Sequence, residues 1–148
     1  MESISVSSRL RDLLGDTACD ILNGPFDATC HRVVYGAAPA AGRIENLSVT
    51  GSRPLSSAEV TALRQSLSDD ATWRWDLITR HRPVPEVLFE LVLGDLRAVF
   101  VLDRRGMKLG LLRDRTIHAR DLNTGSPGAR ALAQIVESSD STHGSEAK

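Results

Sequence analysis

The sequence predicts an α+β fold, with an antiparallel sheet of about five to six strands flanked by two or three helices. Residues 87–111 form short runs of alternating side chains separated by tight turns, which is the pattern of an antiparallel meander. Residues 8–22 and 57–68 repeat apolar side chains at steps of three and four, which is the pattern of amphipathic helices. Helices segregated from a meander argue against a parallel, doubly wound sheet.

The elements before the meander follow from local signals. Asn23-Gly24-Pro25 ends the first helix. Residues 29–35 and 43–50 are expected to be two strands on either side of a small-residue loop. The second helix starts at Ser56-Ser57-Ala58-Glu59, where hydroxyl and carboxylate satisfy the first free amides reciprocally.

Turn and cap residues also order the C-terminal half. Gly94-Asp95 predicts a two-residue turn, and a second turn is expected at 103–106. An edge strand is expected around Ile117. Ser126-Pro127 is an N-cap followed by proline at the first helical position, which predicts a last helix over 127–137. We therefore expect one globular domain over residues 1–137 and a disordered polar tail over 138–148.

Composition excludes several classes of protein. The chain has 148 residues, 41% of them hydrophobic, which is enough for a core without disulfide or metal staples. Eighteen basic against nineteen acidic residues give a net charge of −1, so nucleic acid is not the expected partner. No signal peptide or membrane span is visible. With only Cys19 and Cys30, we expect a cytoplasmic protein with reduced thiols and no membrane partner.

Motifs for metal, nucleophile and phosphate sites do not fit. Cys30 and His31 are adjacent and would face opposite ways on a strand, so with Cys19 they make a poor zinc set. Cys19 lies near the end of a helix, where the dipole would raise rather than lower its pKa. The G-x-S-x-G elbow is absent, and Gly51-Ser52 is expected to lie in a loop. Phosphate loops are also absent. We therefore predict no catalytic residues, no cofactor and no metal.

One carboxylate is placed unusually. Glu90 lies mid-strand between apolar neighbours, and a partly buried carboxylate can mark a site. A pair with Arg97 across the hairpin is the simpler interpretation.

Charge and aromatic residues indicate a binding surface instead. Residues 103–121 carry six basic against three acidic side chains, and residues 1–30 carry five acidic against two basic. Such asymmetry suits docking to a protein or self-association, although an ordinary solvated surface would look the same. Tryptophan and arginine are enriched at interface hot spots, although both tryptophans could instead pack over the sheet. The predicted binding residues are Trp73, Arg74, Trp75, Arg104, Arg105, Arg113 and Arg115.

The order of residues 33–112 resembles a loose set of small uncharacterised bacterial α+β proteins. In that set the segment before the hairpin reads Cys-x-Phe-x-Pro, and the hairpin ends near a Cys-x-x-Cys-like pair. Here the matching stretches read His81-Arg82-Pro83-Val84-Pro85 and Val101-Leu102-Asp103. Because the cysteines are missing, no metal or redox role is carried over. The resemblance implies only the order of elements and a bacterial origin.

These observations favour a non-catalytic protein-interaction module, such as an immunity-type or antitoxin-type inhibitor or an accessory protein. The alternative is a small-ligand-binding protein or enzyme with a pocket between sheet and helices. In that pocket Glu90, His81, His118 or the cysteines would converge. Nucleic-acid binding through residues 104–120 is a third possibility, and it would be sensitive to salt.

Overall fold

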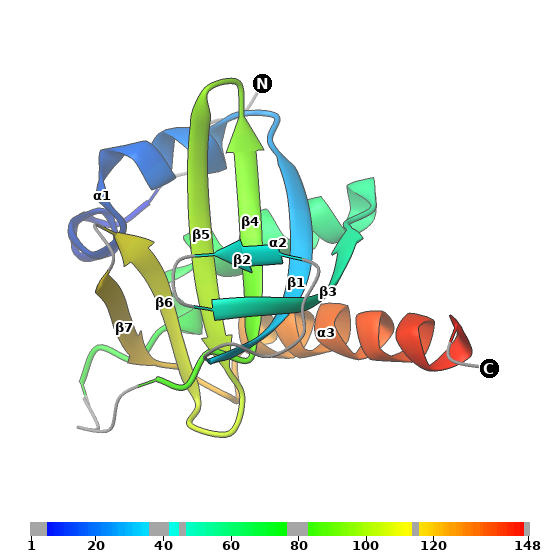
Figure 1. Ribbon diagram of the computed structural model, residues 1–148. Helices are drawn as coiled ribbons and strands as arrows, with labels where there is room; N and C mark the ends of the chain where they lie inside the picture. Colours follow the sequence, from blue (N-terminus) through cyan, green and yellow to red (C-terminus); the bar gives the residue numbers. More distant parts are fainter. Residues whose placement is uncertain (1–5, 36–41, 45–46, 77–82, 114–115, 147–148) are drawn as a thin grey trace.

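The computed structural model describes residues 6–35, 42–44, 47–76, 83–113 and 116–146 (Figure 1). Its single sheet has seven strands in the order β2-β3-β1-β4-β5-β6-β7, and all neighbouring strands are antiparallel. Three helices and a short 3₁₀ turn flank it, which confirms the α+β prediction. The elements are α1 Ser8–Asn23, β1 Asp27–Tyr35, β2 Gly42–Ile44, β3 Leu47–Pro54, α2 Ser57–Ser68, η1 Asp70–Thr72, β4 Val87–Leu93, β5 Leu96–Asp103, β6 Lys108–Arg113, β7 Thr116–Asp121 and α3 Pro127–Glu146.

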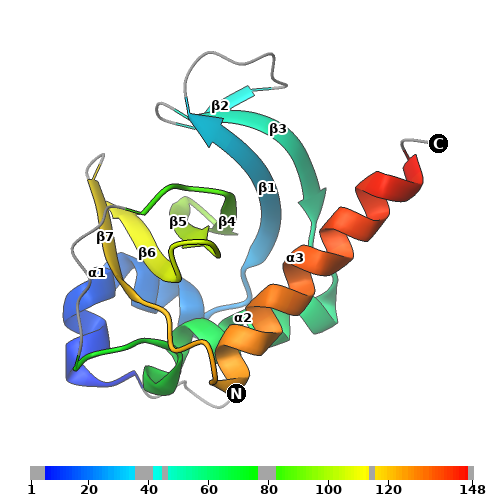
Figure 2. The same ribbon diagram turned by 90° about the horizontal axis from the view of Figure 1, so that it is seen from below.

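The sheet is strongly curled, and its two faces are covered differently. Seen from below in Figure 2, β1 and β3 arch over one side of β4 and β5, while the helices lie on the other side. We call these the concave face and the helix face. β1 and β3 change register between Arg32 and Val33, where Arg32 pairs with Gly51 and Val33 with Val49. Thr50 is therefore an extra residue, and such a β-bulge bends a strand and increases its twist.

The helix face carries the main hydrophobic core. Phe89 and Phe100 lie opposite each other on β4 and β5, and both are fully buried. Leu63 and Leu67 of α2 and Leu132 of α3 belong to the same buried cluster, and α1 packs against β5 and β4. The concave face holds a smaller apolar cluster, which consists of Val33, Leu47, Val49, Leu88, Val99 and Val101.

The first helix begins and ends largely as its sequence predicts. The Ser7 hydroxyl accepts a hydrogen bond from the Leu10 amide, as an N-cap should. At Gly15 the backbone has φ of 83°, which glycine adopts readily, and the helix kinks there. Arg64 of α2 donates from Nε to the carbonyl oxygen of Leu22 at 2.9 Å, and from Nη2 to the Gly24 carbonyl. It thereby satisfies carbonyls that the end of α1 leaves free.

The predicted second helix is confirmed over Ser57–Ser68, with both hydrogen bonds of the capping box. Glu59 has a second role there. Arg53 of β3 binds it with two parallel hydrogen bonds of 2.8 and 2.7 Å. Arg53 Nη2 also donates to the Ile135 carbonyl of α3 at 3.4 Å. One guanidinium thus connects β3 with both helices.

The meander is confirmed, including the turn at Gly94-Asp95 and the edge strand that contains Ile117. Asp103 organises the next turn. Its Oδ1 accepts from the Gly106 amide and its Oδ2 from the Val84 amide, both at 2.9 Å. The segment before the hairpin is thereby fastened to the end of β5.

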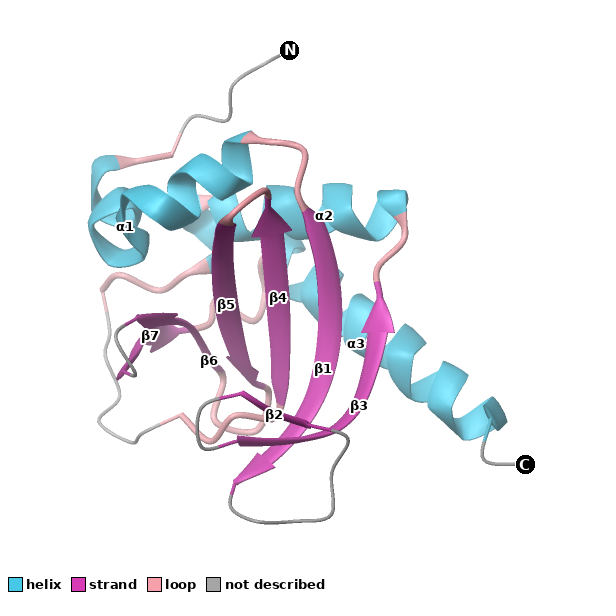
Figure 3. Cartoon of the chain, turned by 45° about the horizontal axis from the view of Figure 1, so that its top comes forward, coloured by secondary structure: helices cyan, strands magenta, loops and turns pink. Residues whose placement is uncertain are grey.

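Three sequence predictions need correction. The expected strand over 43–50 divides into β2 and β3, which pair antiparallel with each other and so cannot be one continuous strand. Gly51-Ser52 lies within β3 rather than in a loop. Residues 138–146 were expected in the disordered tail, but α3 continues to Glu146 (Figure 3). The segment contains no proline, so nothing local forces the helix to stop.

Candidate functional site

Trp75 is the aromatic side chain of the predicted binding segment that reaches the surface. It is partly buried against the core, while Trp73 is 2% exposed and lies inside it. Trp73 and Trp75 do not lie on a common strand. Trp73 forms an isolated bridge with Leu122, and its indole donates to the Leu67 carbonyl. The segment after η1 thus buries the Trp73 indole and leaves the Trp75 indole partly exposed at the surface.

Trp75 is held by contacts on its edge and over its ring. Its Nε1 donates to the Asp70 carbonyl at 3.0 Å. The guanidinium carbons of Arg9 and Arg120 lie 4.7 and 5.5 Å from the ring centroid, within the range of cation–π attraction. Arg9 Nε also donates to Asp70 Oδ2 at 2.8 Å. An α1 residue, the η1 turn and a β7 residue therefore fix one indole.

A surface depression of about 670 Å³ lies beside this indole. Arg74 and Asp76 lie at its margin and pair at 3.4 Å, and the hydrogen bond from Arg74 lowers the pKa of Asp76. The Asn123 amide donates to the Ala71 carbonyl at 2.8 Å. The depression is lined by Arg9, Asp70, Ala71, Trp73, Arg74, Trp75, Asp76 and Asn123, and we call it the Trp75 surface.

Most of the predicted basic region is used inside the fold. Arg104 binds Glu86 through Nε and Nη2 at 3.0 and 2.7 Å, and these bonds hold the pKa of Glu86 below its usual value. Arg113 donates to the Leu13 carbonyl at 3.0 Å, and Lys108 forms a buried ion pair with Asp121 at 2.5 Å. Arg105 is exposed, and Arg115 lies outside the described residues. The surplus of basic residues in the sequence therefore does not form one basic patch.

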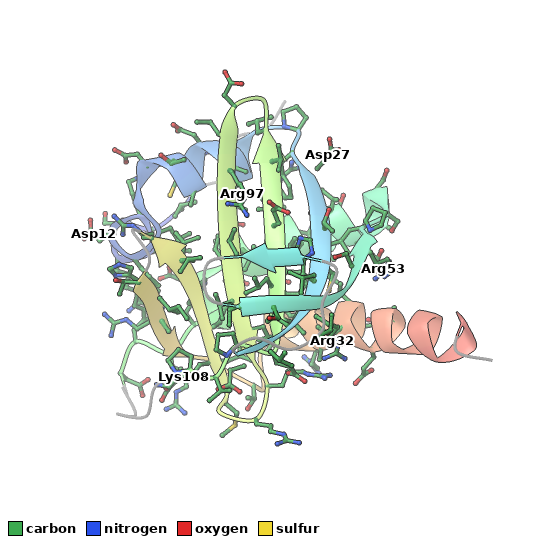
Figure 4. All side chains as sticks on the ribbon, viewed as in Figure 1. Asp12, Asp27, Arg32, Arg53, Arg97 and Lys108 are labelled. Atoms are coloured by element: carbon green, nitrogen blue, oxygen red, sulfur yellow. The ribbon has the colours of Figure 1, made fainter. Side chains whose placement is uncertain are left out.

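The acidic residues of the N-terminal region behave differently. Asp12, Asp16 and Asp20 recur at intervals of four on α1, and all three are exposed, as is Asp27. Arg11 pairs with Asp16 at 3.3 Å, but the Asp16 side chain is 88% exposed. Exposed pairs of this kind contribute little to stability. Figure 4 shows Asp12 and Asp27 at the periphery of the molecule.

The groups expected in a pocket between sheet and helices do not converge. Cys19 and Cys30 are buried free thiols in the helix-face core, and burial raises the pKa of Cys19. Glu90 lies on the opposite face, His118 is exposed on β7, and His81 lies outside the described residues. In the part of the chain that the structure describes, no group of three or more His, Cys, Asp and Glu side chains could hold a metal ion.

The pair of Glu90 with Arg97 is confirmed, and it belongs to a longer row. Arg97 Nε lies 2.5 Å from Glu90 Oε2, and Glu90 Oε1 lies 2.9 Å from Nε2 of His31. Nδ1 of His31 lies 2.7 Å from Oγ of Ser52. The four side chains cross β5, β4, β1 and β3, and Figure 4 shows Arg97 in front of the sheet. The sequence analysis considered His31 only as a zinc ligand and expected Ser52 in a loop, so it did not bring these two side chains together.

No match to this chain was found among protein-family models, curated proteins or solved structures. Over the described ranges, none of the helices has the length and apolar character needed to cross a membrane.

Proposed function

We propose that the protein is an interaction module that binds an acidic segment of a protein partner at the Trp75 surface. The observation that carries the proposal is a partly exposed indole beneath two guanidinium groups at the edge of a depression. Tryptophan and arginine dominate the energetics of many protein interfaces. An immunity-type or antitoxin-type inhibitor would be one such module.

Preorganisation of the indole supports this function. The Nε1–carbonyl bond to Asp70 and the contact with Arg9, itself paired with Asp70, fix the ring before any partner arrives. Binding to a side chain that is already ordered costs less conformational entropy than ordering it in the complex. The Ser7 hydroxyl also donates to Asp70, so the first turn of α1 contributes to the same arrangement.

The charges of the surface favour an acidic partner. Asp70 pairs with Arg9, and Asp76 pairs with Arg74. Among the described residues Arg120 pairs with no carboxylate, and its guanidinium lies over the Trp75 ring. A carboxylate of a partner could therefore pair with the Arg120 guanidinium, which is already placed over the apolar Trp75 ring. We further propose that the protein acts in the cytoplasm, where its free thiols would stay reduced.

A peptide titration tests the proposal. Synthetic peptides that combine Asp and Glu with Leu and Phe would be titrated while tryptophan fluorescence is followed, and peptides with Asn and Gln at the acidic positions serve as controls. We expect only the acidic peptides to bind. Arg120→Gln should weaken binding about tenfold, the effect of a typical hot-spot contact.

Arg11→Gln is the matched control variant. Arg11 lies two residues after Arg9 on the same helix, but it forms an exposed ion pair with Asp16, whereas Arg9 and Arg120 lie over the Trp75 ring. Its replacement should leave peptide binding unchanged. Equal binding of acidic and amide peptides, or equal losses in the Arg120 and Arg11 variants, would contradict the proposal.

A further inference from the structure

Ser52, His31 and Glu90 form a continuous hydrogen-bonded chain on the concave face, away from the Trp75 surface. The Ser52 hydroxyl and His31 Nδ1 are 2.7 Å apart, and His31 Nε2 and Glu90 Oε1 are 2.9 Å apart. A serine, an imidazole and a carboxylate in this order are the components of an activated nucleophile. Here they come from three adjacent strands, β3, β1 and β4.

The charge on Glu90 determines which imidazole nitrogen carries the proton. Partial burial raises the pKa of Glu90, but hydrogen bonds from Arg97 and His31 outweigh it and lower the pKa overall. The carboxylate is therefore ionised at neutral pH and accepts a hydrogen bond from Nε2–H of His31. In the neutral ring Nδ1 then has a free lone pair, which accepts the Ser52 O–H. In the usual Ser-His-Asp triad Nε2 faces the serine and Nδ1 faces the carboxylate, so the two ring nitrogens exchange roles here.

The β-bulge makes this arrangement possible. His31 and Val33 are two residues apart on β1 and share the concave face. Their partners on β3, Ser52 and Val49, are three residues apart, so an unbroken strand would point them to opposite faces. The extra residue Thr50 brings both onto the concave face. Bulges often re-aim side chains beside active sites.

The three hydrogen-bonded side chains differ in exposure in the way that nucleophilic chemistry requires. The side chain of His31 is 12% exposed and that of Glu90 is 23% exposed, so both are held by their surroundings. Ser52, at one end of this hydrogen-bonded series, is exposed, so a reactant can reach its oxygen. Arg97, paired with Glu90 at 2.5 Å, keeps the carboxylate in place from the other side.

We propose that Ser52 is a nucleophile that accepts an acyl group from an activated ester or thioester. Ser52 Oγ forms a bond to the acyl carbon while its proton passes to Nδ1 of His31. The bond from the acyl carbon to the leaving oxygen or sulfur breaks with its electron pair. The leaving group then takes the proton from His31, and Ser52 carries the acyl group as an ester. Glu90 is a positioning residue that holds the imidazole in the required tautomer.

Two reagents test the nucleophile directly. The full chain would be treated with a fluorophosphonate probe and, separately, with p-nitrophenyl acetate, and the modified peptide would be identified by mass spectrometry. We expect a single modification at Ser52. His31→Gln should slow the labelling about a hundredfold, which is the lower range of general-base catalysis. Ser52→Ala should abolish the labelling while the circular dichroism spectrum stays unchanged.

The control for reagent access is Ser57→Ala, because Ser57 is also an exposed serine and has no contact with an imidazole in the described part of the chain. That variant should be labelled at the wild-type rate. ¹⁵N NMR of wild-type His31 should show the proton on Nε2, and Glu90→Gln should slow labelling about tenfold. Labelling spread over several serines, labelling independent of His31, or a proton on Nδ1 would each overturn the proposal.

Discussion

The helix face and the concave face of the sheet are built from alternate residues of the same strands, yet they are filled differently. On β5, Phe100 points into the large core under the helices, while Val101 points into the small cluster beneath the arch of β1 and β3. The concave face also carries a polar row across four strands. The comparison indicates that the helix face supplies most of the stability, which leaves the concave face free to hold polar side chains.

The largest effect is expected from Phe100→Ala. Phe100 is fully buried opposite Phe89, so its removal leaves a cavity that should cost about 3–5 kcal/mol of unfolding free energy. Val101→Ala on the other face removes less apolar volume and should cost about 1–2 kcal/mol. Urea denaturation of both variants measures the difference. Equal losses would mean that the small cluster contributes as much as the main core.

A smaller, pH-dependent effect is expected from Glu59→Gln. The hydrogen bonds from Arg53, reinforced by the Ser56 amide, lower the pKa of Glu59 to about 2 from its usual 4.5, despite partial burial. A lowered pKa in the folded state stabilises the fold above pH 4.5, here by about 3 kcal/mol. This stabilisation is lost as the pH falls from 4.5 towards 2.

The stability gap between wild type and Glu59→Gln, measured by urea denaturation, should therefore be full at pH 7 and shrink as the pH approaches 2. Asp16→Asn is the matched control, since the Asp16 side chain is 88% exposed and its pair with Arg11 should have almost no effect. A gap that stays constant with pH would show that Arg53 does not act through the Glu59 charge.

The smallest effect is expected from Glu90→Gln. Glu90 contacts both His31 and Arg97, but the Arg97 side chain is 51% exposed, and such pairs contribute about 1 kcal/mol or less. The loss should be visible as a small shift of the urea midpoint at pH 7. A loss as large as that of Phe100→Ala would mean that the polar row supports the fold rather than chemistry at Ser52.

Local signals in the sequence predicted local structure well. The capping box at Ser56 and Glu59 and the turn at Gly94-Asp95 are formed by residues close in the chain, so their chemistry was legible without the fold. The kink of α1 at Gly15 was not predicted, because a glycine within a helical pattern does not by itself show which conformation it adopts.

Contacts between residues far apart in the chain could not be predicted from the sequence. His31 pairs with residues 21 and 59 positions away, and the bulge that aligns it with Ser52 leaves no local mark. The predicted basic surface over residues 103–121 was wrong for the same reason, because long-range contacts decide which charges are exposed. Arg104 and Lys108 look like surface charges in the sequence, but their partners Glu86 and Asp121 are supplied by other segments of the fold. Glu90 could be singled out because a charged residue between apolar neighbours in a strand is visible in the local sequence.

The position of Arg64 has a consequence for how the molecule opens. Its guanidinium belongs to α2, but it closes the last carbonyls of α1 and lies over the Phe26 ring at 4.9 Å. The end of α1 cannot fray without also releasing a side chain of α2. The amides of these two helices therefore belong to one cooperative unit in hydrogen exchange, although strands β1, β2 and β3 separate them in the chain.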